Sequence, residues 1–155
     1  MKKIFLNSVL LLFFFNSNAQ DSNFTKKEAI EYITNYYSHF QTGYDFDGKY
    51  KVVSNNYKAT FSGSNFSLTF DTFDENKNTQ NQTITFNLKD VVSMAPNGGD
   101  TVEILGTETI MLPICYKLAF KTKDESHNIN IYNEVDEDVT ETEIYRAFET
   151  LISIN

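Results

Sequence analysis

The sequence predicts an α+β fold: an N-terminal helix, about seven antiparallel strands that form a roll or a strongly bent sheet, and a C-terminal amphipathic helix. Apolar residues recur at helical period over residues 29–40 and again over residues 144–152. Between these segments the period changes to two, and apolar side chains alternate with polar ones, as in half-buried antiparallel strands. No Gly-, Pro- or Ser-rich linker interrupts this order, so residues 20–155 are predicted to form a single globular α+β domain.

The N-terminal segment, residues 1–19, has the pattern of a secretory signal peptide. Lys2 and Lys3 give a positive start, residues 9–15 are an unbroken apolar run, and polar and small residues lead to Ala19, the expected cleavage point. The apolar run is shorter than the roughly 20 residues that a membrane-spanning helix needs. We therefore expect an exported protein, periplasmic or secreted, that is not inserted in the membrane once the signal is removed.

The first helix is predicted to run from residue 26 to about His39 or Phe40. Thr25 and Glu28 have the spacing of a capping box, in which each side chain accepts a hydrogen bond from the other residue's backbone N–H. Gly43 lies just beyond the helix and is expected to end it in a left-handed conformation.

Seven strands are expected between the helices. Turns are predicted at Ser54–Asn56, where polar residues interrupt the alternation, and at Pro96–Gly99, where proline and glycines follow a short apolar segment. The strands are predicted at residues 49–53, 57–62, 65–73, 82–88, 101–105, 110–120 and 128–132.

The last helix is predicted from a second pair of residues with capping-box spacing, Thr140 and Glu143. Ile144, Phe148 and Leu151 then form part of an apolar stripe that a helix would bury against the strands.

This order of elements, over residues 47–153, resembles the pleckstrin-homology-like roll, in which a final helix covers one open end of two sheets. The chain has no tryptophan, so Phe148 is expected to fill the space of the family's usual tryptophan. The basic residues that bind phosphoinositides in that family are also missing, because Ser54–Asn56 occupies the first turn. The resemblance therefore implies the fold and not the lipid-headgroup function. The leader and the Asn-, Phe- and Tyr-rich composition are also similar to small uncharacterised exported proteins of Gram-negative bacteria.

Composition excludes some partners. The formal net charge is −8, and loss of the leader would remove two lysines and no acidic residue. Nucleic acids and anionic membranes bind clustered Lys and Arg, so no nucleic acid partner is predicted. Cys115 is the only cysteine, so an intramolecular disulfide cannot form and stability must come from packing of the core.

The stretch GYDFDGKY, residues 43–50, is the best candidate for a metal site. Asp45, Asp47 and the glycine after them match part of a calcium loop, but Gly43 and Ser54 stand where that loop needs its first and last carboxylates. We interpret the stretch as a turn, and Asp45 and Asp47 stay as candidate cation ligands.

Other chemistry is not indicated. His39 and His127 are expected at the surface, and the acidic run at residues 134–143 has a structural explanation, since carboxylates are favoured near a helix N-terminus. A cation-binding or partner-binding patch is the alternative for that run. No nucleophile–base pair and no cofactor fingerprint is found, so no catalytic residue and no cofactor are predicted.

Three functions are compatible with the sequence. We favour a small exported, non-catalytic module that binds an unknown protein or a small ligand. The second is a hydrolase that uses carboxylates and His39 or His127, and it predicts acids or a histidine in a pocket. The third is a lipocalin-like carrier with a large apolar cavity, which the many inward Phe residues disfavour. The oligomeric state stays open.

Overall fold

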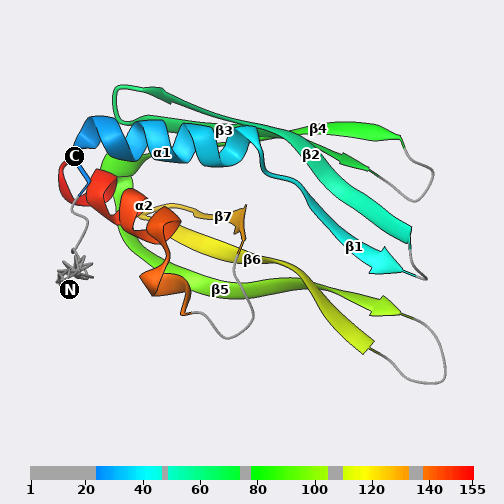
Figure 1. The fold of residues 1–155 in the computed structure, drawn as a ribbon. Coiled ribbons are helices and arrows are strands. Elements are labelled where there is room, and N and C mark those ends of the chain that lie inside the picture. Colours follow the sequence, from blue (N-terminus) through cyan, green and yellow to red (C-terminus); the bar gives the residue numbers. More distant parts are fainter. Residues whose placement is uncertain (1–23, 47–48, 74–77, 105–109, 133–137) are drawn as a thin grey trace, which may run out of the picture.

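The computed structural model describes residues 24–46, 49–73, 78–104, 110–132 and 138–155; for residues 44–46, 49–51, 99–104 and 110–115 only the backbone is described. The leader predicted at residues 1–19 lies outside these ranges. Within them, two helices and seven antiparallel strands follow one another along the chain and confirm the predicted α+β fold (Figure 1). None of the described helices has the length and apolar character needed to cross a membrane. The helices are α1 (Lys26–Ser38) and α2 (Glu143–Ser153), and the strands are β1 (Thr42–Phe46), β2 (Lys49–Ser62), β3 (Asn65–Phe73), β4 (Thr79–Asn87), β5 (Val91–Ile104), β6 (Ile110–Thr122) and β7 (Ser126–Ile131).

Both helices begin at a threonine cap. At α1 the predicted capping box is confirmed, because Glu28 N–H donates to the Thr25 hydroxyl while the Glu28 carboxylate accepts from Thr25 N–H. At α2 the predicted cap was wrong by two residues: Thr142, not Thr140, accepts from the N–H of Tyr145. Thr140 lies instead in a short 3₁₀ turn, Val139–Glu141, that is capped by Asp138.

The four-stranded sheet has the order β1-β2-β3-β4. In its first hairpin, Phe46 of β1 is paired with Lys49 of β2, so the chain reverses inside the stretch that was predicted to turn. The prediction for Gly43 was wrong, because α1 ends at Ser38 with His39 as its C-cap and Gly43 belongs to β1.

The predicted turn at Ser54–Asn56 was also wrong. Strand β2 continues through it, with a bulge between Asn55 and Lys58 in its pairing with β3. Asn56 adopts the left-handed conformation, at φ 55°, and its side-chain amide donates to Asp71 across the sheet at 2.9 Å. Asparagine tolerates this conformation better than most residues, so the polar run produces a bulge and not a chain reversal.

The three-stranded sheet has the order β5-β6-β7. The turn predicted at Pro96–Gly99 was wrong for a similar reason, since the register between β5 and β6 shifts there while the strand continues. Gly98 takes a left-handed φ of 50° within this irregular stretch, which glycine does at little cost.

The core lies where α2 meets both sheets. Figure 1 shows α2 at one end of the molecule, between α1 and the β5–β6 pair, whereas the ends of β1 and β5 point away from the helices. Phe148 of α2 is fully buried and lies edge-on against Phe66 of β3 and Phe120 of β6. One aromatic side chain thus joins the C-terminal helix to the two sheets, and the expectation of a core filled by inward Phe residues is confirmed.

The contact between the helices is expected to make the free energy of unfolding decrease at alkaline pH. The pKa of Tyr32 on α1 is raised to about 12. Burial is the main cause, and the nearby carboxylate of Glu143 is the second. The folded state favours the neutral phenol, so this contribution is complete below the unfolded pKa of about 10 and is lost as the pH rises from about 10 to about 12. Urea unfolding across this range should show a steeper loss of stability for the wild type than for Tyr32→Phe. Burial also raises the pKa of Tyr145, so Tyr32→Phe should still lose some stability over this pH range. Identical pH profiles for the two proteins would contradict this prediction.

Candidate functional site

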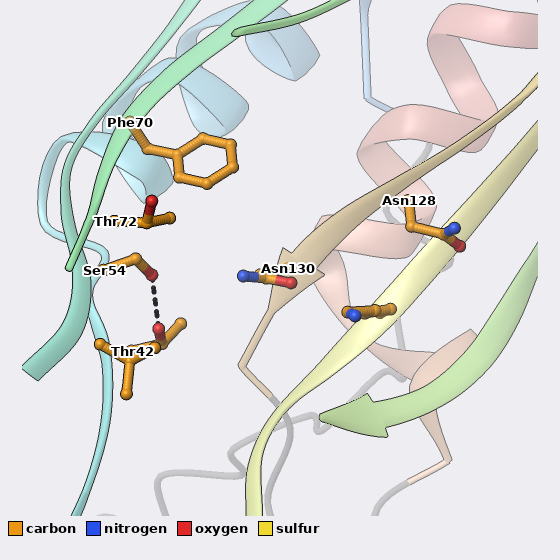
Figure 2. A pocket seen from close by; sticks show the side chains of 8 residues that line it. Thr42, Ser54, Phe70, Thr72, Asn128 and Asn130 are labelled. Atoms are coloured by element: carbon orange, nitrogen blue, oxygen red, sulfur yellow. Dashed lines mark hydrogen bonds between the residues drawn. The ribbon is translucent and has the colours of Figure 1, made fainter. Parts of the chain in front are cut away.

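A cleft of about 240 Å³ lies between the two sheets. One wall comes from β1, β2 and β3, and the other comes from β6 and β7. Figure 2 shows Ser54 and Phe70 on the first wall directed toward Asn130 on the second. We call this space the inter-sheet cleft; its lining residues are Thr42, Val53, Ser54, Phe70, Thr72, Lys117, Asn128 and Asn130.

The β6–β7 wall is the polar face of a sheet whose opposite face belongs to the core. Lys117 pairs with Asn130 in the β6–β7 register, and Asn128 lies two residues earlier on the same face. The intervening Leu118 and Ile129 are buried in the core. Because side chains alternate along these two strands, the apolar residues face the core and the polar residues face the cleft.

The opposite wall is buried at its base. Thr42 of β1 and Ser54 of β2 are only 3% and 2% exposed, and their hydroxyls hydrogen-bond to each other at 2.5 Å. Asn128 is exposed on the facing wall. The cleft thus has a hydroxyl-lined base and an amide that solvent and ligands can reach.

Tyr57 connects the two walls. Its hydroxyl is 2.6 Å from the Ser54 hydroxyl and accepts a hydrogen bond from Nδ2 of Asn130 at 3.0 Å. A second tyrosine, Tyr37 of α1, donates its hydroxyl proton to the backbone carbonyl of Asn130 at 2.9 Å. Because both tyrosines are buried, these bonds are shielded from water and hold Asn130 in a fixed position.

Phe70 is held by stacking. Its ring is parallel to that of Tyr57, with an interplanar angle of 8° and a centroid separation of 4.7 Å. An aromatic ring fixed in this way gives the cleft an apolar surface beside its hydroxyl and amide groups. The combination of a few placed polar groups with an aromatic surface is typical of small-molecule sites.

The structure does not describe a cation site at the predicted ligands. Asp45 lies in β1, where its backbone pairs with Tyr50, and Asp47 lies outside the described residues. Among the residues that are described, no group of three or more His, Cys, Asp or Glu side chains is placed to hold a metal ion. A cation site at Asp45 and Asp47 therefore stays a prediction.

The two histidines lie apart from the cleft lining. His39 caps α1 and is exposed as predicted, with Nδ1 2.8 Å from the hydroxyl of the adjacent Ser38. His127, also predicted at the surface, is partly exposed: its side chain is 16% exposed, and its Nε2 lies 3.6 Å from the exposed carboxylate of Glu125. Its ring stacks on Phe86 at 4.9 Å, and this contact covers one face of the imidazole.

The acidic segment is described only in part, because residues 133–137 lie outside the described ranges. At Asp138 the structural explanation holds. Its carboxylate accepts hydrogen bonds from the backbone N–H and the hydroxyl of Thr140, and these bonds lower the pKa of Asp138. This aspartate stabilises the turn before α2, as expected for a carboxylate at a helix start.

Sequence reasoning missed the cleft. It singled out Ser54 only as part of a turn, and it gave Lys117 and Asn130 no role beyond membership of predicted strands. The available signal was the pair of asparagines that alternates with isoleucine at residues 128–131, which marks a polar face without showing what faces it. Comparisons with protein-family models, with curated proteins and with solved structures find no match to this chain.

Proposed function

We propose that the protein is an exported, non-catalytic binding module that holds a small polar ligand in the inter-sheet cleft. The observation that carries this proposal is the presence of two hydrogen-bonding walls, fixed relative to each other by Tyr57, around a space of about 240 Å³. A liquid water occupies about 30 Å³, so the space accommodates about eight water-sized groups. That volume suits a small metabolite and is too small for a folded segment of a partner protein.

The chemistry of the lining favours binding over hydrolysis. Six of the lining side chains are hydroxyls, amides or an ammonium, and the other two are Val53 and Phe70. Among the side chains that the structure describes, the lining includes no carboxylate and no imidazole, the groups on which the hydrolase hypothesis depends. A lipocalin-like carrier would enclose a large apolar cavity, whereas this cleft has a volume of only about 240 Å³ and polar side chains at six of its eight lining residues.

The arrangement of strands supports the further proposal of a pleckstrin-homology-like roll. A four-stranded sheet is followed by a three-stranded sheet and then by α2, with β1 in contact with β6 and β4 in contact with β7. In such a roll the cleft would lie between the sheets, away from the end that α2 covers.

Ligand-observed NMR with a set of small polar probes tests the binding function. The set comprises neutral hexoses, hexuronates, short hydroxy acids and amino acids, each at millimolar concentration. We expect at least one class to bind the wild type and to lose binding in Asn128→Trp, where an indole would occupy the cleft. The control is Thr83→Trp, at an exposed position of β4 outside the cleft lining. The absence of binding by every probe, or equal binding to Asn128→Trp and the wild type, would overturn the proposal.

A further inference from the structure

Four strands lie at the edges of the two sheets: β1 and β4 in one sheet, and β5 and β7 in the other. A strand at a sheet edge leaves a row of backbone N–H and C=O groups without partners in the sheet, and these groups can pair with a strand of another chain. Proteins limit such pairing with short edge strands, bulges, prolines, charged residues or a helix that covers the edge. The four edges differ in which of these forms of protection they have.

Strands β1 and β5 are protected by their own geometry. β1 has only five residues and a bulge between Thr42 and Gly43, and it lies in contact with β6 of the other sheet. The register of β5 with β6 shifts at three places, and Pro96 of β5 has no N–H to donate. Neither strand therefore offers a long regular edge.

Strand β7 is short and is covered by α1. It has six residues, and Tyr37 of α1 donates its hydroxyl proton to the backbone carbonyl of Asn130 in this strand. The N–H of Tyr132, just after the strand, donates to the hydroxyl of Tyr36 of α1. Side chains of the helix thus occupy the backbone groups at the end of this edge.

Strand β4 has none of these forms of protection. Its sequence, TQNQTITFN, contains no charged residue, no proline and no glycine. It pairs with β3 over nine consecutive residue pairs without a register shift, and β3 is its one neighbour in the sheet among the strands that the structure describes. Its contact with β7 involves side chains, because the ring of Phe86 stacks on that of His127. The outer edge of β4 is therefore a regular, uncharged template for another strand.

The side chains of β4 are complementary to those of a second copy of the same strand. Antiparallel pairing about a two-fold axis at the central residue places Thr83 opposite Thr83 of the second copy. The same register places Asn81 opposite Thr85 and Gln82 opposite Ile84. Threonine pairs across strands are stabilising, and like charges directly opposite each other are destabilising. The chain carries a net charge of −8, so an edge without charged residues is a favourable place for two copies to meet.

We propose that two copies of the protein associate through β4, antiparallel about a two-fold axis at Thr83, so that their four-stranded sheets form one continuous sheet. Pairing of the two strands forms about eight to ten backbone hydrogen bonds, a number similar to that in typical protein interfaces. The edges of both copies are then used, so assembly stops at the dimer. Dimerisation does not depend on the proposed ligand binding, because no residue that lines the inter-sheet cleft belongs to β4.

Sedimentation velocity over a range of protein concentrations tests the dimer. We expect a dissociation constant of about 10–100 μM for the wild type, because the interface has many hydrogen bonds and few apolar side chains. Thr83→Lys should weaken association by about tenfold or more, because it places two ammonium groups opposite each other. An equimolar mixture of Thr83→Lys and Thr83→Asp should restore association, because opposite charges then meet across the axis.

The matched control is Thr60→Lys, which makes the same substitution on the same face of the sheet. Thr60 is exposed on β2 and is opposite Ser67 of β3, which is in turn opposite Thr85 of β4. This position is two strands away from the edge, so the variant should keep the dissociation constant of the wild type.

The outcomes decide each part of the proposal. A wild type that stays monomeric up to about 1 mM would overturn it. Equal association of Thr83→Lys and Thr60→Lys would show that β4 is not the interface, and assemblies larger than a dimer would contradict the two-fold pairing. Failure of the Lys and Asp variants to associate when mixed would overturn the register at Thr83.

Hydrogen exchange of the wild type gives a second measurement that needs no substitution. Alternate backbone amides of residues 79–87 should exchange more slowly as the protein concentration rises, because they become hydrogen-bonded to the second copy. Slower exchange in another strand, with no change in β4, would place the interface elsewhere and overturn the proposal.

Discussion

Replacing Phe148 with alanine is expected to lower the free energy of unfolding by about 3–5 kcal/mol, the usual cost of deleting a buried aromatic side chain. The Phe148 ring is 0% exposed and lies 5.3 Å from the ring of Phe66 and 5.0 Å from that of Phe120, centroid to centroid. Its removal would leave a cavity between α2 and both sheets, and close packing on all sides prevents the neighbours from filling it. Urea or guanidinium unfolding, followed by far-UV circular dichroism, measures the change.

Ile154→Ala is the matched control for Phe148→Ala. Ile154 follows α2 directly and is 51% exposed, so deletion of its side chain should change the free energy of unfolding by no more than about 0.5 kcal/mol. Phe148→Leu should lie between the control and the alanine variant, because leucine keeps part of the buried volume. A loss below about 1 kcal/mol for Phe148→Ala would contradict the view that this residue joins the helix to both sheets.

The role of Phe148 was predictable from the sequence because it depends on local periodicity. An apolar stripe at helical spacing has to be buried, and the alternating strands before it offer inward Phe residues as partners. The same reasoning failed at Ser54–Asn56, where a polar run can produce either a turn or a bulge. The partner strand decided between them: Asp71 lies where it can accept from Asn56, and no local pattern encodes that pairing.

The cleft was less predictable because its residues come from five strands. Thr42 and Lys117 are 75 positions apart in the sequence, and each occupies an ordinary polar position in its own strand. Which polar face meets another sheet, and which meets only solvent, follows from how the two sheets approach each other. A single sequence therefore shows that β7 has a polar face. It does not show that the Tyr57 hydroxyl accepts a hydrogen bond from Asn130 on that face.

The second large effect is expected at Tyr57. Tyr57→Phe keeps the ring that stacks on Phe70 and removes only the hydroxyl, whose partners include Ser54 on β2 and Asn130 on β7. Loss of a partner in a buried network costs about 1–3 kcal/mol, because the remaining groups pay their desolvation without a hydrogen bond. We expect the free energy of unfolding to fall by that amount, measured by urea unfolding. Tyr132→Phe, at a residue that is 64% exposed, should change it by less than about 0.5 kcal/mol.

A double-mutant cycle shows whether the hydroxyl of Tyr57 couples the two sheets. Asn130→Ala removes the amide that donates to it, and the variant with both substitutions removes the pair. Groups in direct contact have interaction energies of about 0.5–3 kcal/mol, whereas independent sites add to within about 0.5 kcal/mol. We expect an interaction energy within the first range, because the hydroxyl contributes less to the free energy of unfolding once the amide is absent. Additive losses would mean that the hydroxyl and the amide contribute independently, and would contradict the view that this hydrogen bond couples the two walls of the cleft.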